Sequence, residues 1–359
     1  MITISLCMIV KNEASTLPRC LDTVGDLADE IIIVDTGSTD NTMEIAKQYT
    51  DLIYQFEWCD NFSAARNYAF AQASMEYCMW LDADDVLEPE DQKRFQELKA
   101  ALPAGTDMVM LPYHTAPDED GRPAITYYRE RLVRREAGFR WEGAIHEAIA
   151  PSGTLYYGAA AVTHRRSGTG DPDRNLRIFE GLRSRGIALS PREQFYYARE
   201  LTYHGRDAEA AQQLEAFLQG GEGWIENCME ACRDLAACYQ RLGQEALVFP
   251  ALSAGLRYGP PRAELCCDLG QYFMDRGEYR TSVFWYELAL TRPKDEAHGG
   301  FSIPDCHDYI PFLQLCVCWY RLGDVEKSRA FNRLAANVRP HSTVCQSNFQ
   351  FFENSSPQG

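Results

Sequence analysis

The first half of the chain alternates short apolar runs with segments of helical periodicity. The apolar runs predict buried strands at 2–10, 30–34, 52–55, 77–81 and 108–112. Apolar residues three or four positions apart predict helices at 14–28, 39–48, 62–73 and 91–102. Strands that alternate with helices are typical of a parallel sheet covered on both faces. In such a sheet, ligands bind at the carboxyl ends of the strands.

The pattern changes after residue 115. Shorter runs predict strands, with an antiparallel arrangement possible, at 126–133 and 160–164, with a turn at 139–141 between them. The basic, glycine-bearing run 165–170 and the following Asp171-Pro172-Asp173 then indicate the end of the domain.

The second half of the chain is helical and repetitive. Four glycines each follow a helix rich in Ala, Leu, Cys and Tyr and precede a second amphipathic helix: Gly205, Gly243, Gly277 and Gly323. The spacing from Gly243 to Gly277, with prolines at 260, 293 and 340, is typical of tetratricopeptide (TPR) repeats. Four degenerate units predict a short right-handed solenoid with a concave face, and an ordinary helical bundle is the alternative. The expected domains are 1–170 (α/β), 171–190 (linker or helix) and 191–359 (TPR-like).

Polar residues follow three of the predicted strands, as Lys11-Asn12-Glu13, Asp35-Thr36-Gly37-Ser38 and Asp82-Ala83-Asp84. An Asp-x-Asp at the end of a buried strand suits Mg²⁺ or Mn²⁺ that also binds a diphosphate, although an Asp that caps the next helix is the structural alternative. Asp35 can accept a hydrogen bond from a base or a ribose hydroxyl. Neither a G-x-G-x-x-G nor a P-loop motif is present, which disfavours a dinucleotide-binding Rossmann domain or a P-loop protein.

Composition narrows the class of protein further. A length of 359 residues fits two domains, and 45% hydrophobic residues indicate a globular chain. The net charge of −17 argues against a nucleic-acid or anionic-membrane partner. The 13 cysteines include no C-x-x-C pair and favour a reducing compartment. The apolar start lacks the features of a signal peptide, and no apolar run reaches the ~18 residues of a membrane span. We therefore expect a cytoplasmic protein without a transmembrane segment.

Four motifs, in order, resemble those of family 2 glycosyltransferases of the GT-A fold. They are the segments ISLCMIVKNE at 4–13, IVDTGSTD at 33–40, NFSAARN at 61–67 and WLDADD at 80–85. The resemblance covers roughly the first half of the chain. It is greatest to the bacterial group with a C-terminal TPR region, which includes relatives of peptide S- and O-glycosyltransferases.

The resemblance implies an inverting, hexosyltransferase-type reaction with a nucleotide-diphospho-sugar donor, most simply a UDP-sugar. By position, Asp35 would contact the uracil base. Val10, Lys11 and Glu13 would line the nucleoside pocket, and Arg66 would lie near the nucleotide or its diphosphate. A helix-surface arginine paired with a nearby acid is the alternative for Arg66.

The resemblance also implies a Mn²⁺ or Mg²⁺ ion. Asp84 would bind the metal that bridges the two phosphates, and Asp82 would face the ribose or the metal. His164 occupies the position at which many GT-A enzymes supply a third metal ligand, and a neutral imidazole is a suitable Mn²⁺ ligand. A purely structural histidine is the alternative.

Inversion needs a base that removes the acceptor proton. The segment from Trp141 to Glu147 resembles the Trp-x-Gly-x-x-His-Glu element of this group, and its candidates are Glu142, His146 and Glu147. If the segment is a strand, His146 and Glu147 point to opposite faces. Glu147 is then the favoured base, and His146 orients the diphosphate or the sugar, or serves as a hydrogen-bonded residue of a sheet.

The acceptor is open from the sequence. Because TPR grooves hold peptides in many proteins, we expect the acceptor to be a peptide or protein side chain, and a glycan or a lipid-linked sugar is the next candidate. The repeats could equally serve dimerisation. A TPR scaffold with a degenerate nucleotide-binding domain is an alternative function, but the intact Asp35, Asp82 and Asp84 weigh against it. A sugar-nucleotide pyrophosphorylase would need a basic, glycine-rich first loop, which Lys11-Asn12-Glu13 does not provide.

Overall fold

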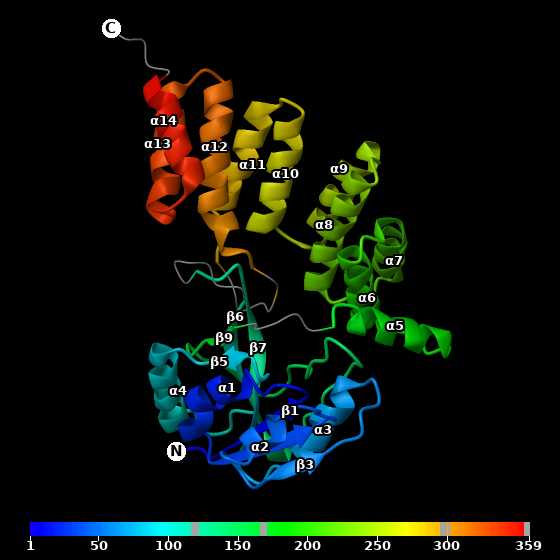
Figure 1. The fold of residues 1–359 in the computed structure, drawn as a ribbon. Coiled ribbons are helices and arrows are strands. Elements are labelled where there is room, and N and C mark those ends of the chain that lie inside the picture. The colour runs from blue at the N-terminus through cyan, green and yellow to red at the C-terminus, as the bar shows by residue number, and fades with distance from the viewer. Residues whose placement is uncertain (116–121, 166–170, 295–299, 301, 355–359) are drawn as a thin grey trace. The chain divides into compact units, whose positions relative to one another are not determined.

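The computed structural model describes residues 1–115, 122–165, 171–294, 300 and 302–354. These residues form two compact units. The first comprises residues 1–196 together with Gly300, and the second begins at Tyr197. The division falls inside helix α6 (Pro191–Tyr203), whose first residues belong to one unit and whose last residues belong to the other. Figure 1 follows the chain through both units.

The first unit is built on one mixed sheet with the strand order β3-β2-β1-β4-β7-β6-β9-β5, and β8 also pairs with β6. The strands are β1 (Ile4–Val10), β2 (Glu30–Asp35), β3 (Ile53–Gln55), β4 (Tyr77–Trp80), β5 (Asp85–Val86), β6 (Met108–Thr115), β7 (Ile125–Arg134), β8 (Leu155–Tyr157) and β9 (Val162–His164). Strands β1 to β4 are mutually parallel, whereas β7 runs antiparallel between β4 and β6.

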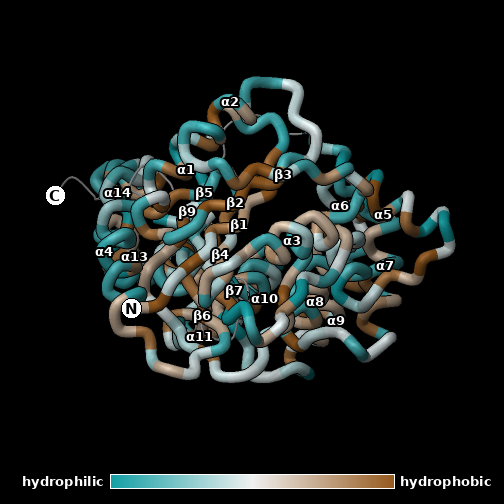
Figure 2. Tube along the Cα trace, turned by 90° about the horizontal axis from the view of Figure 1, so that it is seen from below, coloured by the Kyte–Doolittle hydropathy of each residue, from teal (hydrophilic) through white to brown (hydrophobic). Residues whose placement is uncertain are grey.

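Helices cover both faces of this sheet, as the alternation of strands and helices predicts. They are α1 (Leu17–Val24), α2 (Thr42–Ala46), α3 (Phe62–Ala71) and α4 (Pro89–Ala101). Side chains of a strand alternate between the faces. Leu6 of β1 therefore lies in a core with Leu17 of α1 and Phe95 of α4, and its neighbour Cys7 lies in a second core with Ala69 of α3. Figure 2 shows the apolar positions concentrated along β1, β2 and β4.

Most element bounds are shorter than the sequence predicts, because turns and 3₁₀ segments take up the ends. The predicted helix 14–28 is α1 followed by a 3₁₀ turn at Gly25–Leu27, and the predicted strand 160–164 is reduced to β9. Helix α3 begins where predicted because the Asn61 side chain caps it, accepting from the Ala64 backbone N–H at 2.9 Å. Helix α5 (Arg174–Ser184) occupies the segment expected to be a linker or helix.

The second unit consists of helix pairs. Its helices after α6 are α7 (Asp207–Gly220), α8 (Ile225–Arg241), α9 (Glu245–Ala254), α10 (Ala263–Asp275), α11 (Tyr279–Leu290), α12 (Tyr309–Arg321), α13 (Val325–Val338) and α14 (Thr343–Asn354). The four predicted glycines lie in the turns within the pairs with φ of 69°, 69°, 74° and 86°, a region that glycine adopts without steric cost. Within the described ranges, none of the helices is long and apolar enough to cross a bilayer.

Candidate active site

The polar residues that follow β1, β2 and β4 meet at one edge of the sheet. The parallel register places Val10 opposite Asp35 and Cys7 opposite Trp80, so the three strands end close together. Val10 and Asp35 are 2% and 5% exposed, whereas Lys11 is exposed. The predicted nucleoside-binding residues therefore lie at neighbouring strand ends, which is the position expected for a ligand site in an α/β sheet.

Hydrogen bonds fix the two loops that follow β1 and β2. Asn12 adopts the left-handed backbone region, with φ of 57°, and its N–H donates to Ser38 Oγ at 3.0 Å. Its side-chain Oδ1 accepts from the Thr39 N–H at 2.7 Å. Asp35 Oδ1 accepts from the Ser38 N–H at 2.9 Å. The Asp35 carboxylate is thus held in place before any ligand arrives.

Glu13 lies in the electrostatic field of the acidic segment that follows β4. Burial raises its pKa, a hydrogen bond from Thr16 lowers it, and the negative charges of Asp84, Asp82 and Asp40 raise it further. The result is a raised pKa. Carboxylates that repel one another in this way are stabilised by a cation.

A group with metal-ligand chemistry lies beside this edge. Asp84, Asp85 and His164 place one ligand atom each within 4.8 Å of the others. The pairing of β5 with β9 sets Asp85 opposite His164. His164 Nδ1 is 3.3 Å from Asp84 Oδ1 and 3.6 Å from Asp85 Oδ1, and contacts with these two carboxylates raise the pKa of His164 to about 10. The same oxygens that retain a proton on the imidazole would hold a metal ion instead. Two carboxylates and an imidazole are a donor set that fits Mn²⁺.

Asp85 is an anchor within this group. It is fully buried, and its Oδ1 accepts from the Tyr113 hydroxyl at 2.8 Å. Its Oδ2 accepts from Arg131 Nη1 and from the Asp82 backbone N–H, each at 3.1 Å. Asp84 and His164 are partly exposed, with side chains 26% and 27% accessible. Asp84 and His164 are therefore the residues that a cation can reach from solvent.

Arg66 of α3 connects two other predicted site residues. Its Nη2 donates to Asp82 Oδ1 at 2.6 Å, and its Nε donates to Glu147 Oε1 at 2.5 Å. Burial lowers the pKa of Arg66, but the charges of Asp82 and Glu147 raise it by more. For Asp82 the signs are reversed: burial raises the pKa of its carboxyl, but the positive charge of Arg66 and its hydrogen bond lower it by more. The pKa of Asp82 is therefore lowered. Asp82 thus points to Arg66 and lies outside the Asp84–Asp85–His164 group.

The segment with the candidate bases is a tight loop and not a strand, so the strand geometry that would place His146 and Glu147 on opposite faces does not apply. Glu142 and Ala148 close it with two backbone hydrogen bonds of 3.0 and 3.1 Å. Gly143 (φ 94°) and His146 (φ 51°) reverse the chain in the left-handed region. Glu142 is exposed, whereas Glu147 is 9% exposed.

Helix α6 holds this loop from outside. The His146 ring stacks on Tyr196 with centroids 4.2 Å apart and planes 14° apart. Arg192 Nε donates to the His146 carbonyl at 3.0 Å, and Glu193 Oε1 accepts from the Ala144 N–H at 3.2 Å. The three contacts fix the loop geometry, and the stacking on Tyr196 orients the His146 ring.

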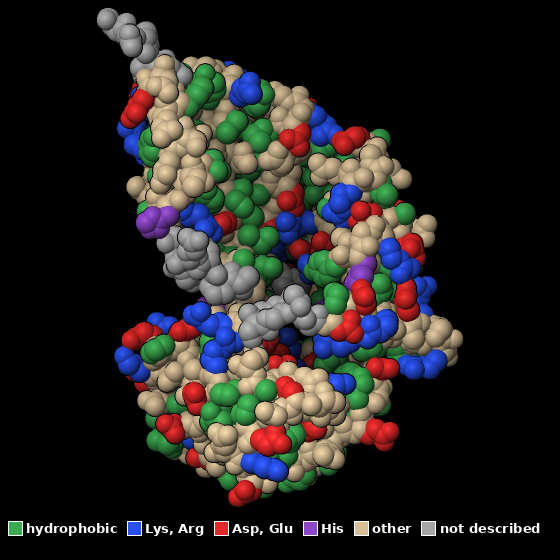
Figure 3. Space-filling view, viewed as in Figure 1, with side chains coloured by type: hydrophobic (Ala, Val, Ile, Leu, Met, Phe, Trp, Pro, Cys, Tyr) green, Lys and Arg blue, Asp and Glu red, His purple; other side chains and the backbone are tan. Residues whose placement is uncertain are grey.

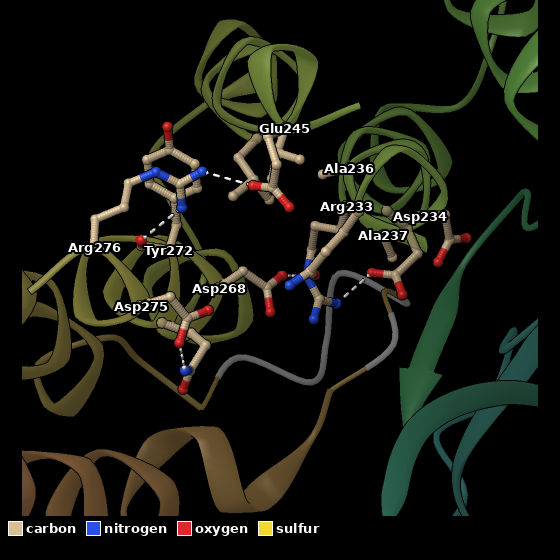
Figure 4. A pocket seen from close by; sticks show the side chains of 14 residues that line it. Arg233, Asp234, Ala236, Ala237, Glu245, Asp268, Tyr272, Asp275 and Arg276 are labelled. Carbon is tan, nitrogen blue, oxygen red and sulfur yellow. Dashed lines mark hydrogen bonds and ion pairs between the residues drawn. The ribbon is translucent and has the colours of Figure 1, made fainter. Parts of the chain in front are cut away.

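The repeats contain a cavity of about 510 Å³ between α8, α9 and α10 (Figures 3 and 4). Its charged lining residues are Glu230, Arg233, Asp234, Glu245, Asp268, Asp275 and Arg276. Arg233 lies between Glu230 and Asp268 and pairs with both, while Arg276 pairs with Glu245 at 2.8 Å. Burial raises the pKa of Asp234 to about 6. This groove is the candidate surface for an extended partner.

The sequence comparisons point to a family for the first unit. The family model described as glycosyl transferase family 2 matches residues 5–157. A TPR repeat-containing protein of Synechococcus elongatus is 31% identical over 310 residues, which cover 83% of this chain and 68% of that protein. The SPbeta prophage-derived glycosyltransferase SunS of Bacillus subtilis is 30% identical over 148 residues, covering 40% of this chain and 34% of that one. The lipopolysaccharide core biosynthesis glycosyltransferase LpsC of Rhizobium meliloti is 28% identical over 159 residues, covering 42% and 58%.

Two solved structures give weaker likenesses. Mycobacterium tuberculosis glucosyl-3-phosphoglycerate synthase, solved with Mn²⁺ and UDP-glucose, has a TM-score of 0.36 and 17% identity, covering 53% of this chain and 82% of that one. The pilus biogenesis factor PilW has a TM-score of 0.40 and 15% identity, covering 49% and 74%. The sequence matches and the fold define the class: the first part of the chain is a family 2 glycosyltransferase domain of the GT-A fold, and TPR-like repeats follow it.

Proposed function

We propose that this glycosyltransferase moves a sugar, with inversion and with the help of Mn²⁺ or Mg²⁺, from a UDP-sugar to a peptide or protein side chain. The observation that carries the proposal is the Asp84–Asp85–His164 group, which adjoins the strand ends where a nucleotide would bind.

Asp84 and His164 would hold the metal ion, while Asp85 keeps the loop in place through Tyr113 and Arg131. When bound, such an ion neutralises the diphosphate of the leaving group. A cation here would also offset the negative charges of Asp84 and Asp82, which, after burial, raise the pKa of Glu13.

Asp35 would recognise the nucleoside. Its Oδ1 is committed to the Ser38 N–H, and we assign its Oδ2 to a uracil N–H or a ribose hydroxyl. Val10 supplies an apolar wall beside it, and Lys11 and Glu13 continue the lining from the loop after β1.

Glu147 is the proposed base that takes the acceptor proton. The ion pair with Arg66 holds its carboxylate in one orientation and links it to Asp82. Glu142 is exposed and the His146 ring is stacked on Tyr196, so the ion pair with Arg66 favours Glu147 among the three candidates. His146 is the candidate for orienting the sugar or the diphosphate.

We assign the acceptor peptide to the groove between α8, α9 and α10, where polar and apolar side chains line an open cavity. A glycan acceptor is the second candidate, because the name of the relative LpsC refers to lipopolysaccharide core synthesis.

The test is donor hydrolysis by the purified chain across a panel of UDP-sugars, with Mn²⁺, with Mg²⁺ and with EDTA. We expect UDP release that requires a divalent cation and that falls in Asp84→Asn. Asp26→Asn, an exposed aspartate in the 3₁₀ turn after α1, is the control. Equal UDP release in EDTA, or full activity in Asp84→Asn, would contradict the metal-dependent mechanism.

A further inference from the structure

Arg66 is enclosed by other side chains, although its Nη1 is buried without a hydrogen-bond partner among the described residues. Its side chain is 7% exposed. The guanidinium carbon lies 4.7 Å from the centroid of the Trp80 ring and 4.9 Å from that of the Trp141 ring. The same group forms ion pairs with Asp82 and Glu147, so two indoles and two carboxylates surround it.

These four partners come from different parts of the sequence. Trp80 and Asp82 lie at the end of β4 and in the loop after it, whereas Trp141 and Glu147 lie in the loop closed by Glu142 and Ala148. Arg66 itself projects from α3. One side chain therefore joins the loop that carries the candidate metal ligand Asp84 to the loop that carries the candidate base.

The chemistry of arginine suits such a link. Its planar guanidinium presents several N–H donors in a fixed fork and stacks on aromatic faces, while lysine offers a single point charge. Nε and Nη2 each serve one carboxylate. Two negative charges already face this single positive charge, so the group adds little attraction for a diphosphate.

We propose that Arg66 is a positioning residue that orients Glu147 relative to Asp82, and that it is not a ligand of the donor diphosphate. The family resemblance implies that Arg66 lies near the nucleotide or its diphosphate, and orienting Glu147 is a different role for it there. The inference rests on the proposed function, in which Glu147 takes the acceptor proton.

The experiment compares Arg66→Lys with the wild-type chain in two measurements: UDP affinity in the presence of Mn²⁺ by calorimetry, and the rate of UDP-sugar hydrolysis or transfer. Because lysine cannot serve both carboxylates, we expect turnover to fall about 100-fold. UDP affinity is expected to change by less than about threefold, since no nucleotide contact is lost. Arg94→Lys is the matched control, because Arg94 also pairs with an acid, Asp91, at 2.9 Å, but its own side chain is 53% exposed.

A double-mutant cycle separates positioning from general damage to the fold. If Arg66 acts through Glu147, the Arg66→Lys/Glu147→Gln protein loses no more turnover than Glu147→Gln alone, within about threefold. If circular dichroism shows that Arg66→Lys does not fold, the Trp141→Phe variant replaces it in both measurements. It keeps the charge but loosens the stack, and we expect a smaller loss of turnover, again at unchanged UDP affinity.

Two results would overturn the inference alone: UDP affinity that falls in step with turnover, or losses that multiply in the double variant. A wild-type chain that shows no Mn²⁺-dependent UDP binding and no turnover would instead remove the proposed function and this inference with it.

Discussion

Two regions are rich in carboxylates: the edge of the GT-A sheet where β1, β2 and β4 end, which we call the mouth, and the groove between α8, α9 and α10. The two regions differ in which of their carboxylates are paired with arginines. In the groove, Glu230 and Asp268 share Arg233, Glu245 pairs with Arg276, and Asp234 lies 3.4 Å from Arg199. At the mouth, Asp84 has His164 as its charged neighbour and, among the described residues, forms no ion pair with a lysine or arginine.

The difference shows why a high density of acids does not by itself define a metal site. Arginines pair with four of the five acids that line the groove, and the fifth, Asp275, accepts a hydrogen bond from Gln271, so a cation would gain less there. At the mouth, arginines neutralise Asp82 and Asp85, while Asp84 and an imidazole are left at a partly exposed position. The distribution of the arginines therefore distinguishes the proposed metal ligand Asp84 from its neighbours Asp82 and Asp85.

The largest expected effect is the loss of turnover when Asp84, the mouth carboxylate without an arginine partner among the described residues, is changed. Asp84→Asn removes a ligand charge, so metal-dependent turnover should fall at least about 100-fold. The matched change in the groove, Asp268→Asn, should leave the Mn²⁺ concentration for half-maximal activity unchanged. Titration of Mn²⁺ into both variants during UDP-sugar hydrolysis measures this. Similar shifts in both variants would show that the two regions do not differ as argued.

The next largest effect is the loss of stability when an arginine is removed from each region. Arg131 and Asp85 are fully buried, and Arg131→Met leaves the carboxylate without its cation, at a cost of about 3–5 kcal/mol. Arg276→Met removes the partner of Glu245, which is 61% exposed, and should cost about 0–1 kcal/mol. Thermal unfolding followed by circular dichroism measures both. Equal losses of stability would mean that the buried pair is not the anchor of the metal-binding loop.

The smallest expected effect concerns Asp234 in the groove. Burial raises its pKa from 3.8 to about 6, so the folded state binds a proton that the unfolded state releases between these values. Stability contributed by this group is present below pH ~4 and is lost as the pH rises to ~6, by at most about 3 kcal/mol. Chemical unfolding of wild type and Asp234→Asn at pH 4, 5, 6 and 7 measures it. The variant should show a flatter pH dependence, and an unchanged dependence would contradict the burial of this charge.

The sequence was sufficient for the features that depend on local pattern. Continuous apolar runs such as 4–10 specify buried strands, and Gly243 and Gly277 specify the turns within two helix pairs. The acids at the ends of β2 and β4 were predicted to meet because parallel strands end at the same edge.

Other features depend on partners far away in the chain and escaped prediction. Asp85 was seen only as the residue after Asp84, because its anchoring role comes from Tyr113 and Arg131. The third acid of the segment Asp82-Ala83-Asp84-Asp85 is the available signal. The loop at 142–148 was taken for a possible strand because the positive φ of a non-glycine residue, His146, leaves no mark in the pattern.

The most direct test of the central claim is calorimetric titration of UDP into the wild-type chain and into Asp84→Asn, with Mn²⁺ and with EDTA. We expect wild-type binding that is strong with Mn²⁺ and weak with EDTA, and Asp84→Asn binding that is weak in both. UDP binding of equal strength in all four titrations would contradict the claim that Asp84 and His164 hold a cation against the diphosphate.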